Sequence, residues 1–87
     1  MIGLLWFDDD PRRDLEEKVG NAARRYMEKF GRPPTVCYVH PSMVGHLISP
    51  DNGHLVLKVE GRDVCVVPRR SVLRDHFWLG EGPVAEH

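Results

Sequence analysis

The feature that most constrains this chain is an amphipathic stretch from Pro11 to Phe30. Its apolar residues recur at steps of three and four, which places them on one stripe of an α-helix, and charged residues fill the opposite side. The apolar stripe consists of Leu15, Val19, Ala22, Ala23, Tyr26, Met27 and Phe30. Asp10 followed by Pro11 predicts the helix start, and Gly31 predicts a left-handed C-cap. Such a helix has to pack its stripe on another part of the fold.

Two segments that flank the helix have the character of strands. Ile2–Phe7 is a short, nearly continuous apolar run, and Thr35–His40 is rich in β-branched and aromatic residues. A strand, a long helix and a second strand together predict a βαβ unit with a parallel, right-handed crossover.

A β-hairpin is predicted in the second half of the chain. Apolar residues alternate in His54–Glu60, and Asp63–Val67 has the composition of the returning strand. Gly61-Arg62 between them predicts a type II′ turn, because glycine stands first. These elements predict a small α+β domain, an α/β sandwich in which a βαβ unit is followed by a β-hairpin. Its mixed sheet has about four strands, with one long helix on one face.

The remaining segments are predicted to be short or irregular. Pro41–Leu47 has the apolar residues of a short helix, and Ser49–Gly53 is a dense turn signal. Phe77–Leu79 is an apolar cluster that we expect to pack against the domain. We therefore expect a single α/β domain over residues 1–80 and a flexible C-terminal tail over residues 81–87.

The predicted strands carry more apolar side chains than one helix can cover. Ile2–Phe7, Thr35–Val39 and Val64–Val67 have apolar groups on both faces, as strands buried on both sides do. Short segments can cover part of the second face, and any remainder would form an exposed apolar patch of the kind that marks an interface. This surplus predicts a homodimer or a protein partner.

Size, charge and composition exclude several classes of protein. The 87 residues suffice for one small domain, and a net charge of −1 argues against a dedicated nucleic-acid binder without excluding a local basic patch. No run approaches the ~18 apolar residues of a membrane span. Ile2–Phe7 lacks the basic and small residues that accompany a signal peptide. A cytoplasmic location is therefore expected, with Cys37 and Cys65 as buried thiols.

Acidic residues and a histidine follow the first two predicted strands. Asp8 and Asp9 leave the first strand and His40 leaves the second, at the edge where parallel strands end and ligands tend to bind. Carboxylates with an imidazole could hold a divalent cation such as Mg²⁺ or Mn²⁺, and metal-assisted phosphoester hydrolysis would follow. The alternative is structural, with Asp10 as helix cap and the other two aspartates favouring the positive helix N-terminus.

A basic and aromatic segment follows the predicted hairpin. Arg69, Arg70 and Arg74 stand close to His76 and Trp78 in the sequence. Arginines beside an exposed aromatic ring can bind phosphates and stack a base, which predicts binding of nucleic acid or another polyanion. The alternative is a solvated sheet edge, where charges discourage aggregation.

No complete active-site constellation is present in the sequence, and no catalytic residues are predicted. The leading hypothesis is a small non-catalytic cytosolic domain that acts through self-association or a protein partner, without membrane association. A metal-dependent hydrolase or phosphodiesterase site at the two aspartates and His40 is the first alternative. Polyanion binding through the three arginines is the second.

Overall fold

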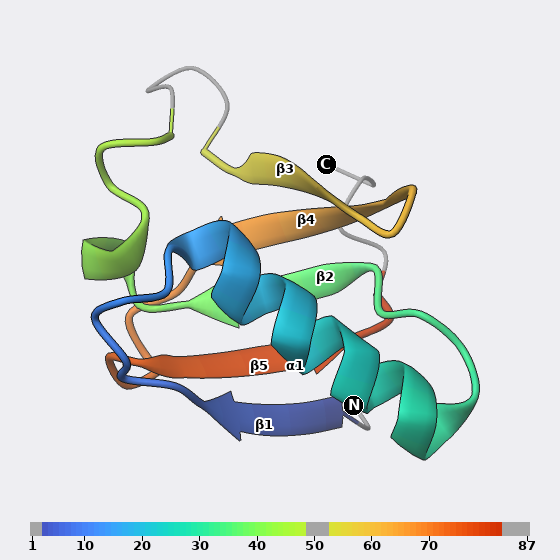
Figure 1. Cartoon of the computed structure of the whole chain (residues 1–87). Coiled ribbons are helices and arrows are strands. Elements are labelled where there is room, and N and C mark those ends of the chain that lie inside the picture. Colours follow the sequence, from blue (N-terminus) through green and yellow to red (C-terminus); the bar gives the residue numbers. More distant parts are fainter. Residues whose placement is uncertain (1–2, 49–52, 83–87) are drawn as a thin grey trace.

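The computed structural model describes residues 3–48 and 53–82, which form one α-helix and five β-strands in a single mixed sheet (Figure 1). In chain order the elements are β1 (Gly3–Phe7), α1 (Leu15–Phe30), β2 (Val36–Val39), a 3₁₀ turn (Pro41–Met43), β3 (Leu55–Val59), β4 (Arg62–Pro68) and β5 (His76–Gly80). The predicted α+β class with one long helix is confirmed, with five strands rather than four.

The fifth strand changes the order of the sheet. The order is β1-β5-β2-β4-β3, so β5 lies between β1 and β2. Because β5 is antiparallel to both, β1 and β2 are parallel to each other as predicted, although they are not neighbours. β2 pairs in parallel with β4, and β3 and β4 form the predicted antiparallel hairpin. The cluster Phe77–Leu79 is thus the centre of an internal strand.

The helix begins later than the sequence pattern predicted. Its N-cap is Asp14, whose Oδ1 accepts a hydrogen bond of 2.8 Å from the Glu17 N–H, while Glu17 Oε1 accepts one of 3.2 Å from the Asp14 N–H. This reciprocal capping box satisfies two backbone donors. The predicted start at Asp10 and Pro11 is therefore wrong. Gly31, with a φ of 77°, forms the predicted left-handed C-cap.

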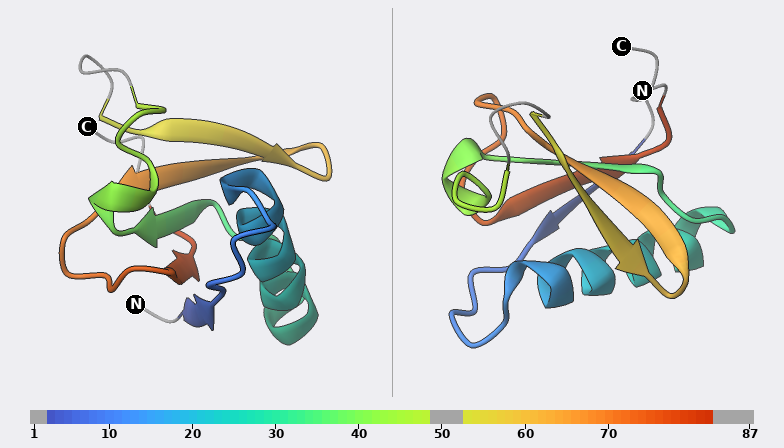
Figure 2. Two further views of the ribbon diagram at one scale, coloured as in Figure 1. Left: turned by 60° about the vertical axis from the view of Figure 1, so that its left-hand side comes forward. Right: turned by 90° about the horizontal axis from the view of Figure 1, so that it is seen from above.

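The apolar stripe of α1 packs on one face of the sheet (Figure 1). Val19, Ala22 and Tyr26 are almost completely buried there. The strands contribute alternate residues to this core, since successive side chains of a strand point to opposite faces. The strand residues of the core are Cys37, Val39, Val64, Val66, Phe77 and Leu79, with Leu4, Trp6, Leu55, Leu57 and Val59 packed at its margin. The opposite face of the sheet carries no helix from the described residues (Figure 2).

The segment after β2 differs from its prediction. In place of a short helix over Pro41–Leu47, the chain forms the 3₁₀ turn and further hydrogen-bonded turns, and Gly45 at the centre of this segment disfavours a helix. Met43 and Val44 pack against the core. Most of the predicted turn over 49–53 and of the predicted tail over 81–87 lies outside the described residues. No helix in the described part of the chain is long and apolar enough to cross a membrane.

The hairpin turn lies one residue earlier than predicted. Val59 pairs with Arg62, so Glu60 and Gly61 are the two loop residues, and their φ angles are 52° and 81°. Positive φ at both positions is typical of a type I′ turn rather than the predicted type II′ turn, and its twist matches that of the strands. Gly61 adopts this conformation freely, whereas the Cβ of Glu60 is strained in it.

Replacing Glu60 with asparagine should therefore stabilise the fold. Asparagine tolerates the left-handed conformation better, so Glu60→Asn is expected to raise the free energy of unfolding by about 0.5–1 kcal/mol. The substitution also removes an exposed ion pair of 3.6 Å with Arg24, which contributes little. Urea denaturation measures the change, and Arg24→Gln, which removes the ion pair without altering the turn, is the control. A variant less stable than both Arg24→Gln and the wild type would contradict the type I′ assignment.

Candidate functional site

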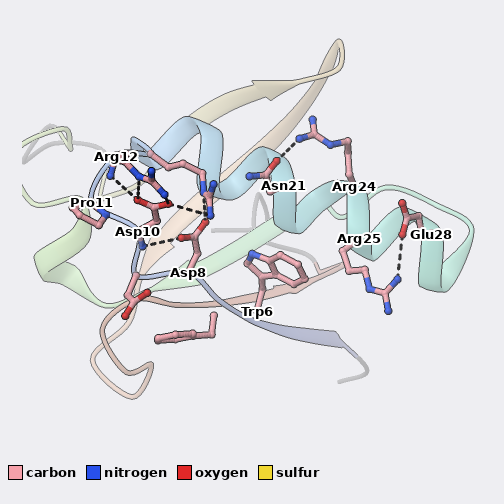
Figure 3. Close-up of a pocket in the computed structure, with 12 residues that line it drawn as sticks. Trp6, Asp8, Asp10, Pro11, Arg12, Asn21, Arg24, Arg25 and Glu28 are labelled. Atoms are coloured by element: carbon pink, nitrogen blue, oxygen red, sulfur yellow. Dashed lines mark hydrogen bonds and ion pairs between the residues drawn. The ribbon is translucent and has the colours of Figure 1, made fainter.

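An open groove lies beside strand β1, between the strand and helix α1 (Figure 3). Its volume is about 880 Å³. The lining residues are Trp6–Arg13 from β1 and the loop that follows it, with Asn21, Arg24, Arg25 and Glu28 from the helix. We call this hollow the β1–α1 groove. It includes Asp8 and Asp9 of the predicted metal site but not His40.

The loop between β1 and α1 is organised by carboxylates that accept hydrogen bonds. Asp8, whose side chain is only 6% exposed, accepts from the Asp10 N–H at 3.0 Å and from Arg13 Nε at 2.9 Å. Asp10 accepts from the backbone N–H of Arg12 at 2.9 Å and from its guanidinium at 3.0 Å (Figure 3). These two aspartates hold a turn that leads the chain into the helix, rather than capping the helix itself.

The same contacts keep the two carboxylates charged. Burial alone would raise the pKa of Asp8, but hydrogen bonds from the Asp10 N–H and Arg13, with the positive charges of Arg13 and Lys18, lower it below its ordinary value. Arg12, through its side chain and its backbone N–H, lowers the pKa of Asp10 to about 2. The loop is therefore held by ionised groups at neutral pH.

The charges along the β1–α1 groove are balanced. Its arginines are Arg12, Arg13, Arg24 and Arg25, and its carboxylates are Asp8, Asp9, Asp10 and Glu28. Ion pairs join several of them, including Arg13 with Asp8 at 2.9 Å and Arg25 with Glu28 at 3.2 Å. Since attraction of a charged ligand requires an excess of the opposite charge, this groove suits an uncharged occupant.

Trp6 lies between the strand and the helical wall of the groove (Figure 3). Its indole N–H is buried and has no hydrogen-bond partner among the described residues. An unpaired buried donor costs stability, and most buried donors in folded proteins are paired. The groove is thus lined by a residue whose hydrogen-bond donor the described residues leave unsatisfied.

Strand β1 forms one free edge of the sheet, because it is first in the strand order and pairs only with β5. The Asp8 N–H donates to the Asp75 carbonyl at 2.9 Å, and β1 residues opposite β5 alternate between bonded and non-bonded pairs. Leu4 and Trp6 therefore bond to β5, whereas Gly3, Leu5 and Phe7 direct their N–H and C=O groups to the free edge. The strand Gly3–Phe7 contains no charged residue and no proline.

The face of the sheet opposite α1 carries exposed apolar side chains. We call this the open face. Leu5 and Phe7 of β1 are each 57% exposed on it, and Val56 of β3 is 50% exposed. Leu5 pairs with Trp78 of β5, which in turn pairs with Tyr38 of β2, and both of these rings are half-buried. The surplus of apolar strand residues thus forms an uncovered surface in the described part of the chain.

His40 lies on a different strand from the two aspartates. Because β5 separates β1 from β2, the backbones of these two strands are about 10 Å apart. The His40 Nδ1 accepts a hydrogen bond of 3.1 Å from the Ser42 N–H and contacts the Ser42 hydroxyl at 2.8 Å. Across residues 3–48 and 53–82, no three His, Cys, Asp or Glu side chains are grouped to hold a metal ion. A divalent-cation site at Asp8, Asp9 and His40 stays a prediction from the sequence.

The predicted polyanion site lies in the connection between β4 and β5. Arg69, Arg70 and Arg74 are all exposed there. The Arg69 guanidinium stacks 4.0 Å from the centre of the Tyr38 ring, which places it on the open face. From the sequence, His76 and Trp78 were the expected aromatic neighbours of these arginines. The ring that contacts Arg69 in the structure is Tyr38 of β2, which the sequence analysis did not identify.

The two cysteines lie on opposite faces of the sheet. Cys37 is buried under α1, and Cys65 is partly buried on the open face. Burial raises the pKa of both thiols. Both are free, and their environment makes them poor nucleophiles.

Comparison with protein-family models, curated proteins and solved structures found no match for this chain. Its function has to be argued from the residues themselves. Sequence reasoning had missed the helical wall of the groove and the free edge of β1. The uncharged run Gly3–Phe7 is visible in the sequence, but only the strand order shows that it forms an edge of the sheet.

The pH dependence of stability should depend on the loop aspartates. The pKa of Asp10 in the folded chain is about 2, below its ordinary value of 3.8, so its stabilising effect is present above about pH 4 and is lost as the pH falls through 2. Asp10→Asn keeps an oxygen for the turn but removes this charge. We expect lower stability at neutral pH and a shallower loss between pH 4 and 2, measured by thermal unfolding.

The neighbouring variant Asp9→Asn is the control for that experiment, since it removes the same charge from an exposed side chain of the same loop. If Asp10→Asn retained the full wild-type loss of stability below pH 4, the ion pair with Arg12 would not be the cause of the acid sensitivity.

Proposed function

We propose that this chain is a non-catalytic interaction domain that self-associates through β1. Two copies pair their β1 strands antiparallel about a twofold axis, which joins two five-stranded sheets into one. The unprotected edge of β1 carries this proposal. It offers unpaired backbone groups along an apolar strand, and such edges are templates for pairing with another chain.

The other edge of the sheet is better protected against such pairing. β3 carries Lys58, which forms an ion pair of 2.8 Å with Asp63 on the neighbouring strand, and the charged residue Glu60 follows its last residue. Charged side chains on an edge discourage pairing with a second chain. β1 has no such feature, so β1 rather than β3 is the favoured edge.

The register of β1 supports a second copy as the partner. Leu5 is the middle residue of the strand, so a twofold axis at Leu5 sets it against the partner's Leu5 and sets Gly3 against the partner's Phe7. All three residues that direct their backbone groups outward are then paired. Gly3 has no side chain of its own, and the Trp78 indole lies over it, so the partner's Phe7 ring would pack beside that indole.

Side chains on both faces fit the same arrangement. On the open face, the exposed Leu5 of each copy would meet the partner's Leu5, with Phe7 diagonal to this pair, so that both side chains leave water. On the other face, a partner strand would lie along the β1–α1 groove, whose balanced charges suit an uncharged strand. Arg25 and Glu28 lie on the helical wall of the groove. In the dimer they would offer one positive and one negative charge to helix α1 of the other copy.

Sedimentation velocity tests the proposal with a variant that places one charge at the centre of the interface between the two β1 strands. Over about 1 to 200 µM, where a small interface of this kind dissociates, the wild type is expected to convert from monomer to dimer. Leu5→Lys should remain monomeric over the same range, because its ammonium would face the partner's ammonium. Leu5→Pro should do the same, since it removes an outward N–H that has no partner within the monomer.

Leu73→Lys is the matched control. Leu73 is 70% exposed in the connection before β5 and belongs to no strand, so the same substitution there should leave dimerisation unchanged. A wild type that remains monomeric at the highest concentration would contradict the proposal. Equal loss of dimer in the Leu5 and Leu73 variants would also contradict it.

A further inference from the structure

The connection between β4 and β5 holds three arginines in a fixed loop. The Arg69 N–H donates to the Val39 carbonyl at 2.7 Å, which ties the start of the loop to β2. Within the loop, the Val72 N–H donates to the Arg69 carbonyl at 3.1 Å, and His76 Nδ1 contacts the Arg74 carbonyl at 2.9 Å. These backbone contacts limit the freedom of the loop, so its cations are held at one end of the sheet.

These cations differ from most of the other arginines. Arg12, Arg13, Arg24, Arg25 and Arg32 each lie within 4 Å of a carboxylate. In the described part of the chain, no such ion pair is formed by the three arginines of the loop. Asp75 supplies one nearby negative charge along the chain, against three positive charges. The loop thus carries a local positive excess on a molecule whose total charge is −1.

An aromatic surface adjoins the loop on the open face. Tyr38 and Trp78 lie opposite each other on neighbouring strands, and the ring of Tyr38 already holds the Arg69 guanidinium at 4.0 Å. The indole of Trp78 extends over Gly3, where a Cβ would lie only 3.0 Å from Cζ2 of the ring. Phe7 and His76 continue the aromatic surface, with ring centres 4.9 Å apart. No helix from the described residues lies over this face of the sheet (Figure 2).

We propose that this end of the open face binds single-stranded nucleic acid. Arg70 and Arg74 contact backbone phosphates, while Trp78 and the Arg69 guanidinium held on Tyr38 stack against one or two bases. A sheet face that combines stacking rings with a cationic rim is a common way to bind single strands, because every base has a π-face and every nucleotide a phosphate. Arginine suits this place, since its planar group both stacks on a ring and binds phosphate oxygens.

The geometry favours single strands over a duplex. A duplex hides the faces of its bases, so the half-buried rings of Tyr38 and Trp78 would gain nothing from it. The single helix α1 lies on the far side of the sheet, where it cannot enter a groove of nucleic acid bound to the open face. This binding does not require the dimer, because both the rings and the loop belong to one copy of the chain.

Fluorescence anisotropy with a labelled thymidine oligonucleotide of about 12 nucleotides tests the proposal, and an abasic deoxyribose-phosphate chain of the same length isolates the phosphate contribution. The wild type should bind the oligonucleotide at low salt and prefer it to the abasic chain. Trp78→Leu should weaken oligonucleotide binding about 5- to 100-fold and remove most of that preference. Arg70→Gln should lower the slope of log affinity against log salt by about 0.7, the value for one phosphate contact.

Arg62→Gln is the matched control, because Arg62 begins β4 at the end of the sheet far from the loop and has no ion pair among the described residues. It should leave the salt slope unchanged, and circular dichroism should show that each variant is folded. Three results would overturn the proposal: no oligonucleotide binding at low salt, equal affinity for the abasic chain, or equal effects of Arg62→Gln and Arg70→Gln. Binding to phosphatidylserine vesicles without binding to the oligonucleotide would overturn it as well.

Discussion

The packing of one helix on one face of the sheet is the constraint from which the rest of this structure follows. The 16-residue helix α1 buries its apolar stripe against alternate residues of the strands, and it can cover only one side. Because strand side chains alternate, each core residue has a neighbour that points the other way. Cys37 and Tyr38 of β2 illustrate this, with the thiol under the helix and the ring on the open face. Both proposed interactions use surfaces that α1 leaves uncovered.

A second constraint is the short path from β1 to α1. Asp8 and Asp10 accept hydrogen bonds from the loop backbone and from two arginines, which makes a tight charged turn before the capping box at Asp14. This turn leads the chain from the end of β1 to the start of α1, and the β1–α1 groove lies between the strand and the helix. The aspartates that the sequence marked as metal ligands or helix cap thus have a structural role as acceptors in a turn.

Much of the fold was predictable, because its main signals are local. The stripe of α1, the stop at Gly31 and the alternation in the hairpin depend on neighbouring residues alone. The helix start was missed because Asp10-Pro11 and the box formed by Asp14 and Glu17 are both plausible starts. β5 was missed because the short run after Asp75 becomes a strand through pairing on both sides. The candidate sites were less predictable, since Arg69 on Tyr38 and the free edge of β1 depend on strand order.

Amide hydrogen exchange of β1 at two protein concentrations tests the central claim of edge pairing most directly. Within one copy, the N–H groups of Leu5 and Phe7 point to the free edge, whereas that of Trp6 is bonded to β5. Pairing of two copies predicts that the protection of Leu5 and Phe7 rises with protein concentration, while the protection of Trp6 stays the same. Unprotected amides at Leu5 and Phe7 at every concentration would contradict the claim.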